Sequence, residues 1–592
     1  MSSRAALVIA MVVSPLLASA EPASHAAMRP LPVASARPAA TGPVRHVDAA
    51  RGDDAGDGSA KRPWKTLGAA VRHLAPGDTL YVHAGTYFES VTIALRGTEQ
   101  APITIRSAPG ELAMKGGASG EFESVHAFPD VHRDADGGRG VWVVGNFADS
   151  LVPLHGYRFD ADFRSDNPHW NVPGNTEPGA GIWLGPGVWF DWQSHRVHVR
   201  LAHTTGQPDN YTGETDPRKL ALVIGLDRSA LVLDRAAHVR IWDLVLRGSA
   251  TRTVSIEAAS HIELDGVTIY GGAPALYVGS TDHLRLVRSG ISPYLFVAGS
   301  RAPQSRDWEL AYSEFTDGHD GIVIDSVKHL AFHHNRIDNF NDDGIYLSLP
   351  PRVAPPEDVR IYENLVSRIY TTLAFAEADD HTPAPIGTGV YVYRNVFDLR
   401  DGTYTWIAKD ASGAPTISAS RLCGDHGSPT WEPLLFYHNT VVTAGPAVRD
   451  YYAAQLVMGT RGTRRRIFNN AFVQIEGNPG LNVPSPGDDL EADGNLLWGL
   501  KAGPAFHGDF FAARKARPGT LGAHDVFGDP RLAHVEAAGA LDVRPAGGGV
   551  VDAGVKLPAE WPDSLHAADR GPPDIGALPL GAAMLRVGPA AR

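Results

Sequence analysis

An internal repeat constrains the possible folds of this chain more than any other feature. Nine segments align when each begins at a turn residue, and they start at His238, His261, His283, Asp307, His329, Asp358, Gly389, Pro433 and Arg464. The fourth and ninth residues of every segment are apolar, and the alternation around them is typical of strands with one buried face. Short strands that recur every 22 to 29 residues in the first six segments predict a solenoid. Its coils would stack at the strand spacing of about 4.8 Å.

Two positions of the repeat carry recurring side chains. The seventh position is asparagine in the later segments, at Asn335, Asn364, Asn395, Asn439 and Asn470. Stacked coils would place these side chains one above another at a sharp corner, where asparagine tolerates left-handed turns and bonds to the backbone. The fifth position is aromatic at Tyr362, Tyr393, Tyr437 and Phe468. We expect an outward aromatic stack there, with a packing role favoured over sugar binding.

The first twenty residues are typical of a secretory signal. Arg4 supplies the positive start, an apolar run follows, and Ala18-Ser19-Ala20 is a small-residue cleavage site. We therefore expect a periplasmic or extracellular protein that has no membrane association after cleavage. Cys423 is the only cysteine, so stability in an oxidising compartment has to come from the core without disulfides.

Segments outside the repeat define the remaining organisation. Leu67, Ala70, Val71 and Leu74 have helical spacing, which predicts a short amphipathic helix that caps the first coil. The stretch 115–222 interrupts the repeat with Trp-rich, β-like runs, so we expect an inserted β-rich lobe. The predicted order is a signal peptide (1–20), a flexible linker (21–43), an N-terminal cap with the first coils (44–114), the lobe (115–222), the β-helix coils (223–499) and a C-terminal cap or tail (500–592).

The charge balance restricts the possible partners. The formal net charge is −13, which argues against general nucleic-acid binding. An acidic polysaccharide would have to be met by local Arg and Lys side chains or by bound cations, because the overall field repels it. We expect a monomer that acts on a polysaccharide.

Motifs at both ends and in the repeats resemble a known superfamily. The opening DGSAKRPWKTLGAAV…PGDTLYVHAGTY, the repeats YENLV, YRNVF and YHNTV, and the closing GPPDIGALPLG are similar to secreted proteins of the pectate-lyase-like superfamily. The resemblance covers most of residues 45–580, apart from the lobe. It implies an all-β fold, the right-handed parallel β-helix. The superfamily includes polysaccharide lyases, glycoside hydrolases, uronate epimerases and noncatalytic adhesins, so the fold leaves the reaction open.

The richest polar cluster lies in two consecutive repeats. Aligning Gly321-Ile322 with Gly344-Ile345 stacks Asp320 over Asp343 and His319 over Asp342. Equivalent side chains of adjacent coils are then roughly 5 Å apart. At that distance either one carboxyl keeps a proton or a cation neutralises the pair. The alternative interpretation is that these are turn residues chosen for their backbone geometry.

Each outcome predicts a different chemistry. A shared proton provides the acid and the base of glycoside hydrolysis. A cation would be Ca²⁺ held by Asp320, Asp342 and Asp343, which could bridge to a uronate while His319 removes the C5 proton. Four further residues are candidate substrate-binding residues at the same face: Asp317, His333, Lys409 and Arg421. The cluster is similar in kind to the acids of polygalacturonases, and Asp317-Gly318-His319-Asp320 to the Asp-Pro-His-Asp/Glu motif of mannuronan epimerases.

Three functions follow from these observations. The favoured one is a secreted enzyme that cleaves glycosidic bonds as a hydrolase or a lyase, with uronate-containing polymers among its candidate substrates. The second is a noncatalytic, carbohydrate-binding or adhesive solenoid that uses the aromatic stack and the inserted lobe. The third is uronate C5 epimerisation at the acidic cluster.

Overall fold

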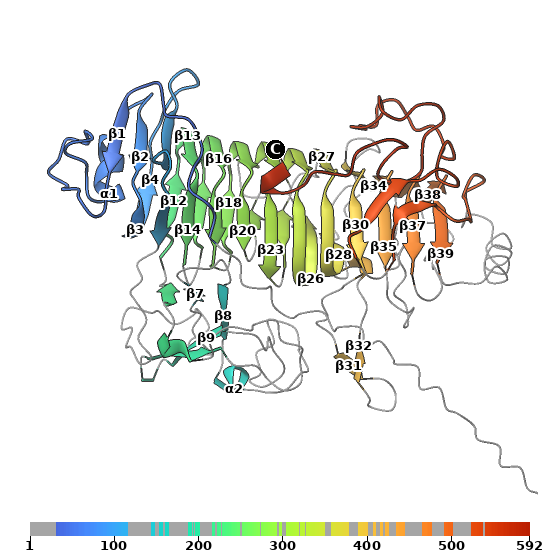
Figure 1. Ribbon diagram of the computed structural model, residues 1–592, viewed down its shortest axis with the longest axis horizontal. Coiled ribbons are helices and arrows are strands. Elements are labelled where there is room, and N and C mark those ends of the chain that lie inside the picture. The colour runs from blue at the N-terminus through green and yellow to red at the C-terminus, as the bar shows by residue number, and fades with distance from the viewer. Residues whose placement is uncertain are drawn as a thin grey trace, which may run out of the picture.

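The computed structural model describes residues 31–116, short stretches between 144 and 225, most of 228–377, 389–400, short stretches between 407 and 443, 465–475, 490–500 and most of 522–591. The chain winds into a long spiral of parallel strands (Figure 1). Three strands of each complete coil form three faces, which we call sheet I, ladder 1 and ladder 2. Ladders 1 and 2 belong to one hydrogen-bonded sheet of 19 strands. The fold is the right-handed parallel β-helix that the repeats predict.

Sheet I is built from the first strand of each repeat and pairs in parallel along its whole length. Its strands in spatial order are β1 (Val44–Val47), β2 (Thr79–Val82), β5 (Ile103–Ser107), β13 (Ala237–Trp242), β16 (Ser260–Asp265), β19 (Asp282–Val287), β22 (Arg306–Ala311), β25 (Lys328–His333), β27 (Glu357–Tyr362), β29 (Val390–Tyr393), β34 (Leu434–Tyr437), β36 (Arg465–Phe468) and β38 (Leu490–Asp493). The last of these belongs to one more coil, beyond the nine aligned repeats.

Ladder 1 follows sheet I after a tight corner. Its strands are β3 (Gly85–Phe88), β6 (Ala113–Gly116), β14 (Leu244–Arg247), β17 (Thr268–Tyr270), β20 (Gly290–Ser292), β23 (Glu314–Gly318), the first parts of β26 (Arg336–Leu349) and β28 (Leu365–Glu377), β30 (Val396–Leu399), β35 (Thr440–Thr443), β37 (Ala471–Gln474) and β39 (Leu496–Gly499). Ladder 2 consists of β4 (Val91–Ile93), β12 (Leu231–Asp234), β15 (Val254–Glu257), β18 (Leu276–Gly279), β21 (Leu295–Ala298), β24 (Ile322–Asp325), the later parts of β26 and β28, and β33 (Arg421–Asp425).

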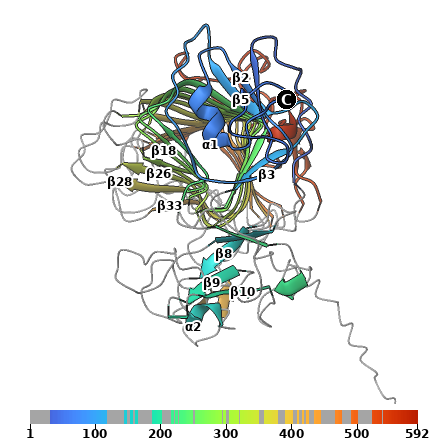
Figure 2. The ribbon, with the colours of Figure 1, turned by 90° about the vertical axis from the view of Figure 1, so that its left-hand side faces the viewer.

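The interior is filled by the apolar positions of the repeat. The fourth and ninth residues are almost completely buried, as at Ile241, Leu264, Phe332 and Phe397. The N-terminal end is closed by α1 (Leu67–Ala70), which continues into the 3₁₀ helix η1 (Val71–His73) and lies across the opening of the coil in Figure 2. Thr66 caps α1 by accepting a hydrogen bond from the Ala69 backbone N–H. The predicted cap helix is therefore confirmed.

The asparagine ladder occupies the corner between sheet I and ladder 1, which we call the ladder corner. Each asparagine accepts the backbone N–H of the equivalent residue one coil earlier, as in Asn364 N to Asn395 Oδ1 at 3.0 Å. The ladder extends past the predicted residues, because Ser289 and Ser313 fill the position upstream and Asn495 and Asp525 continue it downstream. The preceding residue has a positive φ in successive coils, for example 54° at His334 and 55° at Arg394. The predicted structural role is confirmed.

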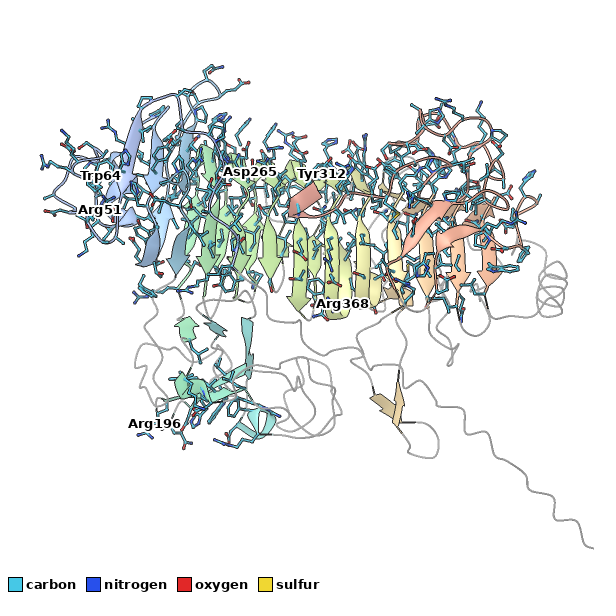
Figure 3. All side chains as sticks on the ribbon, viewed as in Figure 1. Arg51, Trp64, Arg196, Asp265, Tyr312 and Arg368 are labelled. Carbon is cyan, nitrogen blue, oxygen red and sulfur yellow. The ribbon has the colours of Figure 1, made fainter. Side chains whose placement is uncertain are left out.

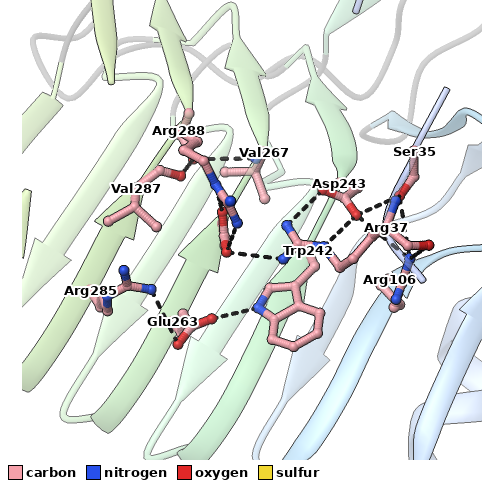
Figure 4. Close-up of polar contacts among 12 residues, drawn as sticks. Ser35, Arg37, Arg106, Trp242, Asp243, Glu263, Val267, Arg285, Val287 and Arg288 are labelled. Atoms are coloured by element: carbon pink, nitrogen blue, oxygen red, sulfur yellow. Dashed lines mark hydrogen bonds and ion pairs between the residues drawn. The ribbon is translucent and has the colours of Figure 1, made fainter. Parts of the chain in front are cut away.

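Both ends of the described part of the chain return to this corner. Residues near Arg37 lie over the early coils, where the Arg37 guanidinium binds Asp243 at 2.9 Å and Asp265 at 3.1 Å (Figure 4). The composition predicts a flexible linker there, but these ion pairs fasten it to the coils. The C-terminal segment runs back over the late coils, where Arg394 binds Asp563 at 2.8 Å. The terminal residues reach the middle of the helix, since the Gly588 N–H donates to the His334 carbonyl.

The aromatic stack is present but packed under the C-terminal segment. Tyr362, Tyr393 and Tyr437 are stacked with ring centroids 5.0 and 5.3 Å apart. Trp561 from the tail covers the lower part of the stack, 5.3 Å from Tyr437. The rings lie on the outer side of sheet I, as expected, and Tyr393 and Tyr437 are buried because the C-terminal segment packs over them. The packing role that the sequence favoured is the one observed.

The inserted lobe has its own sheet. Its strands β7 (Val144–Phe147), β8 (Pro153–Tyr157), β9 (Gly187–Asp191), β10 (Arg196–Arg200) and β11 (Leu222–Gly225) pair in the order β10-β9-β8-β7-β11, next to the short helix α2 (Asp160–Phe163). Figures 1 and 2 show this lobe beside the early coils, on the side away from sheet I. Smaller elements are the 3₁₀ helices η2 (Pro217–Lys219) and η3 (Pro589–Ala591) and the hairpins β31 (Ile407–Lys409)–β32 (Pro415–Ile417) and β40 (Leu532–His534)–β41 (Asp542–Pro545). None of the helices in the described part of the chain has the length and apolar content needed to cross a bilayer.

Candidate active site

Asp320 and Asp343 stand at equivalent positions of adjacent coils, where ladder 1 turns into ladder 2. Ile322 of β24 pairs with Ile345 of β26, and the Gly321 N–H donates to the Asp343 carbonyl at 2.7 Å. This backbone register is the one obtained by aligning the two Gly-Ile pairs. Asp343 is buried, with 2% of its surface exposed, while Asp320 is partly exposed.

The glycines of these pairs are required by close contact between coils. A Cβ on Gly321 would lie 2.4 Å from the Gly344 carbonyl oxygen, and a Cβ on Gly344 would lie 2.7 Å from Ile369 Cδ1. A side chain on Gly321 would push apart the two coils that carry the aspartates, and a side chain on Gly344 would press on β28 of the next coil. The turn interpretation and the site interpretation of these motifs are therefore compatible.

Tyr346 connects the two carboxylates electrostatically. Its neighbours Ile345 and Leu347 point into the core, so strand alternation directs Tyr346 to the outer face of ladder 2. Burial raises the pKa of Tyr346 to about 12, and the charges of Asp343 and then Asp320 add to the increase. The phenol is therefore protonated at neutral pH, and both carboxylates contribute to its raised pKa. Sequence reasoning missed this residue because it counted Ile345-Tyr346-Leu347 only as an apolar strand.

The other acids and the histidine of the predicted cluster are less fully described. Asp317 belongs to β23 and Asp342 to β26, but their side chains lie outside the described residues, as does the whole of His319. Pairing in this region shifts register between Phe340 and Asp343. The predicted stacking of His319 over Asp342 and the separation of the two carboxyl groups stay predictions.

Arg421 is placed in the same row as the aspartates. Asp343 pairs with Thr371 of β28, and Thr371 pairs with Arg421 of β33. Two strand spacings separate the Arg421 backbone from Asp343, about 10 Å. Its side chain is outside the described residues. The sequence suggested a loop residue that reaches over the face, and the structure gives it a fixed position in a strand.

Two predicted substrate-binding residues lie elsewhere. Lys409 ends one strand of the β31–β32 hairpin, and its side chain is not described. His333 is the last residue of β25 in sheet I, where its ring is stacked on Tyr362 at 4.8 Å and its Nε2 lies 3.6 Å from Glu309. Sheet I is a different face of the coil, so His333 is not brought together with Asp320 and Asp343.

The outer face of ladder 2 carries further polar groups along the helix axis. Asp325 is buried at the end of β24, in register with Ser348. On an earlier coil the Arg252 guanidinium lies 3.3 Å from the centre of the Tyr277 ring and 2.8 Å from Glu257. Tyr277 and Tyr346 occupy one row of successive pairings that runs across β18, β21, β24 and β26. Aromatic and charged side chains thus flank the aspartate pair on one face.

A second buried carboxylate holds β26 against β28. Asp338 is fully buried and accepts hydrogen bonds from Arg368 at 2.8 Å and from Arg336 at 3.0 Å (Arg368 is labelled in Figure 3). Burial would raise the pKa of Asp338, but the hydrogen bonds and charge of Arg368 outweigh it and the pKa is lowered. This ionised group fixes the two strands that carry Asp343 and Thr371.

The described residues contain no group of three His, Cys, Asp or Glu side chains that could hold a metal ion. The predicted Ca²⁺ site also needs Asp342, whose side chain is outside that set. Calcium binding at Asp320, Asp342 and Asp343 therefore stays a prediction.

Comparisons with known proteins give partial matches. No family model matches the chain. A stretch of 77 residues is 40% identical to the α-1,3-galactosidase A of Akkermansia muciniphila, which is 13% of this chain and 13% of that protein. A stretch of 76 residues is 33% identical to YwoF, an uncharacterized protein of Bacillus subtilis, and covers 12% of this chain and 16% of that one. The matches span less than one fifth of either relative.

Solved structures with similar folds cover more of the chain at low identity. The complex of XylC with xylose is 14% identical, with a TM-score of 0.45, and the match covers 83% of this chain and 87% of that one. Pectate lyase Pel9A is 10% identical, with a TM-score of 0.37, and the match covers 92% of this chain and 97% of that one. The strand order of the chain itself makes it a right-handed parallel β-helix protein.

Proposed function

We propose that the protein is a secreted carbohydrate-active enzyme that cleaves glycosidic bonds at Asp320 and Asp343. The observation that carries the proposal is the register of β24 and β26, which sets these two acids on adjacent coils beside Tyr346. The partial identity to an α-1,3-galactosidase supports a carbohydrate substrate. The signal-like first twenty residues support export.

The two acids have different environments, and this difference suits acid–base catalysis. In a hydrolysis with two carboxyl groups, one of them acts as the general acid and donates a proton to the glycosidic oxygen. The other is ionised and activates water or attacks the sugar. Tyr346, protonated at neutral pH, would supply a hydrogen-bond donor to the carboxylate that is ionised during the reaction.

A lyase reaction on a uronate polymer is the second candidate, and the position of Arg421 favours it. The Arg421 backbone lies two strands from Asp343 in the same row. At this distance its guanidinium would reach the carboxylate of a uronate bound beside the aspartates and pair with it. In that case His319 would remove the C5 proton, the C4–O bond to the leaving sugar would break, and the leaving oxygen would take up a proton, with no water consumed. The product would carry a new carbon–carbon double bond, which separates the lyase from the hydrolase.

The test is a screen of neutral and uronate-containing polysaccharides, read for both reducing ends and ultraviolet absorbance of unsaturated products. We expect Asp320→Asn and Asp343→Asn each to lower kcat/KM by about a thousandfold, the usual range for a general acid or base. Tyr346→Phe should lower it by about tenfold, since one hydrogen bond to a charged group is lost. Asp358→Asn, on the sheet I face, is the matched control and should keep full activity. Unchanged activity of Asp320→Asn and Asp343→Asn would refute the assignment.

A further inference from the structure

The outer face of sheet I contains a groove that the catalytic proposal does not use. It encloses about 540 Å³ and crosses the coils from β13 to β25. Its floor is the backbone of the strands, because Ile262, Leu284 and Trp308 point into the core. Its walls are two rows of outward side chains, two residues apart along each strand. We call it the histidine groove.

The first wall is a column of stacked imidazoles. His238, His261 and His283 stack with ring centroids 4.3 Å apart, and the column continues to Asp307 and His329 on the next two coils. All five residues have positive φ, between 52° and 60°, which turns their side chains outward at the start of each strand. The ring nitrogens of His238 and His261 have no hydrogen-bond partner within the part of the chain that the structure describes. They are therefore available to a ligand.

The second wall alternates in charge. Arg240, Glu263, Arg285 and Glu309 are in register on successive strands. Arg285 lies 3.6 Å from Glu263 and 2.8 Å from Glu309, and Glu263 also accepts a hydrogen bond from the Trp242 indole (Figure 4). Glu263, Arg285 and Glu309 hold one another, and Arg240 lies over the Trp242 ring, so the row presents donors and acceptors alternating at the strand spacing of about 4.8 Å.

Charge and shape restrict the class of ligand. The carboxylates in the lining outnumber the guanidinium groups, since Glu99, Glu263, Asp307 and Glu309 face Arg240 and Arg285. The excess negative charge disfavours an anionic polymer, and no three of the described side chains are arranged for a metal ion. An extended ligand is favoured because the groove crosses five strands, or about 19 Å. Hydroxyl groups, which both donate and accept, fit two walls that offer both kinds of partner.

We infer that the histidine groove binds a neutral oligosaccharide that lies along the helix axis, separately from the aspartate pair on ladder 2. Sugar rings would lie over the strand backbones, and their hydroxyls would bond to the free imidazole edges on one side and to the Arg–Glu row on the other. Such a site would hold a polymer on the enzyme without cutting it.

The chain provides matched controls for a test. His261→Gly removes the central ring of the stack and keeps a residue that accepts the φ of 54°. Asp358→Gly makes the same kind of change at the same position of the repeat, φ 53°, one coil beyond the groove. Arg285→Ala removes the cation of the charged wall, and Arg360→Ala does so in the same row outside the groove.

The experiment is calorimetric titration of the full chain carrying Asp320→Asn and Asp343→Asn with cellotetraose, xylotetraose and tetragalacturonate. We expect saturable binding of a neutral tetrasaccharide, weakened at least tenfold by His261→Gly and by Arg285→Ala and unchanged by both controls. The inference is overturned if neither neutral sugar binds, if tetragalacturonate binds more tightly, or if the two groove variants bind as well as the controls. Absence of glycosidase or lyase activity would leave this result intact, so the two proposals fail separately.

Discussion

Asn395 offers a quantitative test of the asparagine ladder that fixes the coils. Its side chain is completely buried. The amide nitrogen donates to the carbonyls of Ile361 at 2.9 Å and Tyr393 at 3.0 Å. The amide oxygen accepts both the backbone N–H and the side-chain amide of Asn364, at 3.0 and 2.9 Å. The amide nitrogen also donates to Asn439 Oδ1 at 3.0 Å, so Asn395→Ala removes five bonds at once.

The expected loss follows from the groups that are left behind. The buried Asn364 N–H loses its acceptor, which costs about 1–3 kcal/mol, and each further hydrogen bond contributes about 1 kcal/mol. We expect the free energy of unfolding to fall by about 4 kcal/mol. Asn395→Ser should lose only about half as much, because serine supplies the accepting oxygen that Ser313 already provides to the Ser289 N–H on an earlier coil.

Urea denaturation followed by circular dichroism measures the total effect, and hydrogen exchange at the Asn364 amide measures it locally. The local measurement is needed because a solenoid is stabilised mainly by contacts between neighbouring coils and need not unfold in two states. Faster exchange at Asn364 should accompany the global loss. A change below about 1 kcal/mol, with normal protection of that amide, would show that the ladder is not a stabilising element.

Two further predictions concern buried titratable groups. His438 is completely buried, and burial followed by the nearby Arg394 lowers its pKa well below the usual value, so the folded protein keeps it neutral. Only the unfolded chain takes up its proton as pH falls below about 6.5, so stability should decrease by up to about 1.4 kcal/mol per pH unit below that value. His438→Asn should flatten this part of a stability–pH curve, and an identical slope would contradict the reasoning. Arg368→Met should lower the free energy of unfolding by about 3 kcal/mol, because buried Asp338 then loses the ion pair with Arg368 and keeps the contacts with Arg336 and Ser367. Thermal unfolding measures this loss, and Arg360→Met, at an exposed ion pair, should change the stability little.

The sequence was sufficient for the fold because the repeat is local and regular. Apolar residues at fixed positions determine which side of each strand is buried, and the asparagines mark one corner. Ser289 and Ser313 were not identified as rungs because an isolated serine has no distinctive spacing. The path of the C-terminal segment could not be predicted either, since Arg394 and Asp563 are 169 residues apart and neither belongs to a shared motif.

The candidate site was predictable only where it followed the repeat. The alignment of two Gly-Ile pairs gave the register of Asp320 and Asp343. Tyr346 was not predicted, because a tyrosine between isoleucine and leucine is typical of a buried strand. Its outward direction is known only once the buried face of the strand is known. The spacing of the repeats does not show that His333 lies on a different face of the coil from the aspartates. The assignment of a residue to sheet I or to ladder 2 depends on the positions of the corners, which the spacing does not give.

The positions at which segments are inserted into the coils are related to the positions of the aspartate pair and the histidine groove. From β16 onward the ladder corner consists of two residues in each coil, and its hydrogen bonds run from Ser289 to Asp525, so a loop inserted there would break the ladder. Both ends of the chain also cover parts of this corner. In the described coils, the long segments between successive strands therefore leave at the other two corners, as the lobe does between β6 and β12. Those corners border ladder 2, so insertions there can vary around Asp320 and Asp343 without disturbing the stack that aligns them.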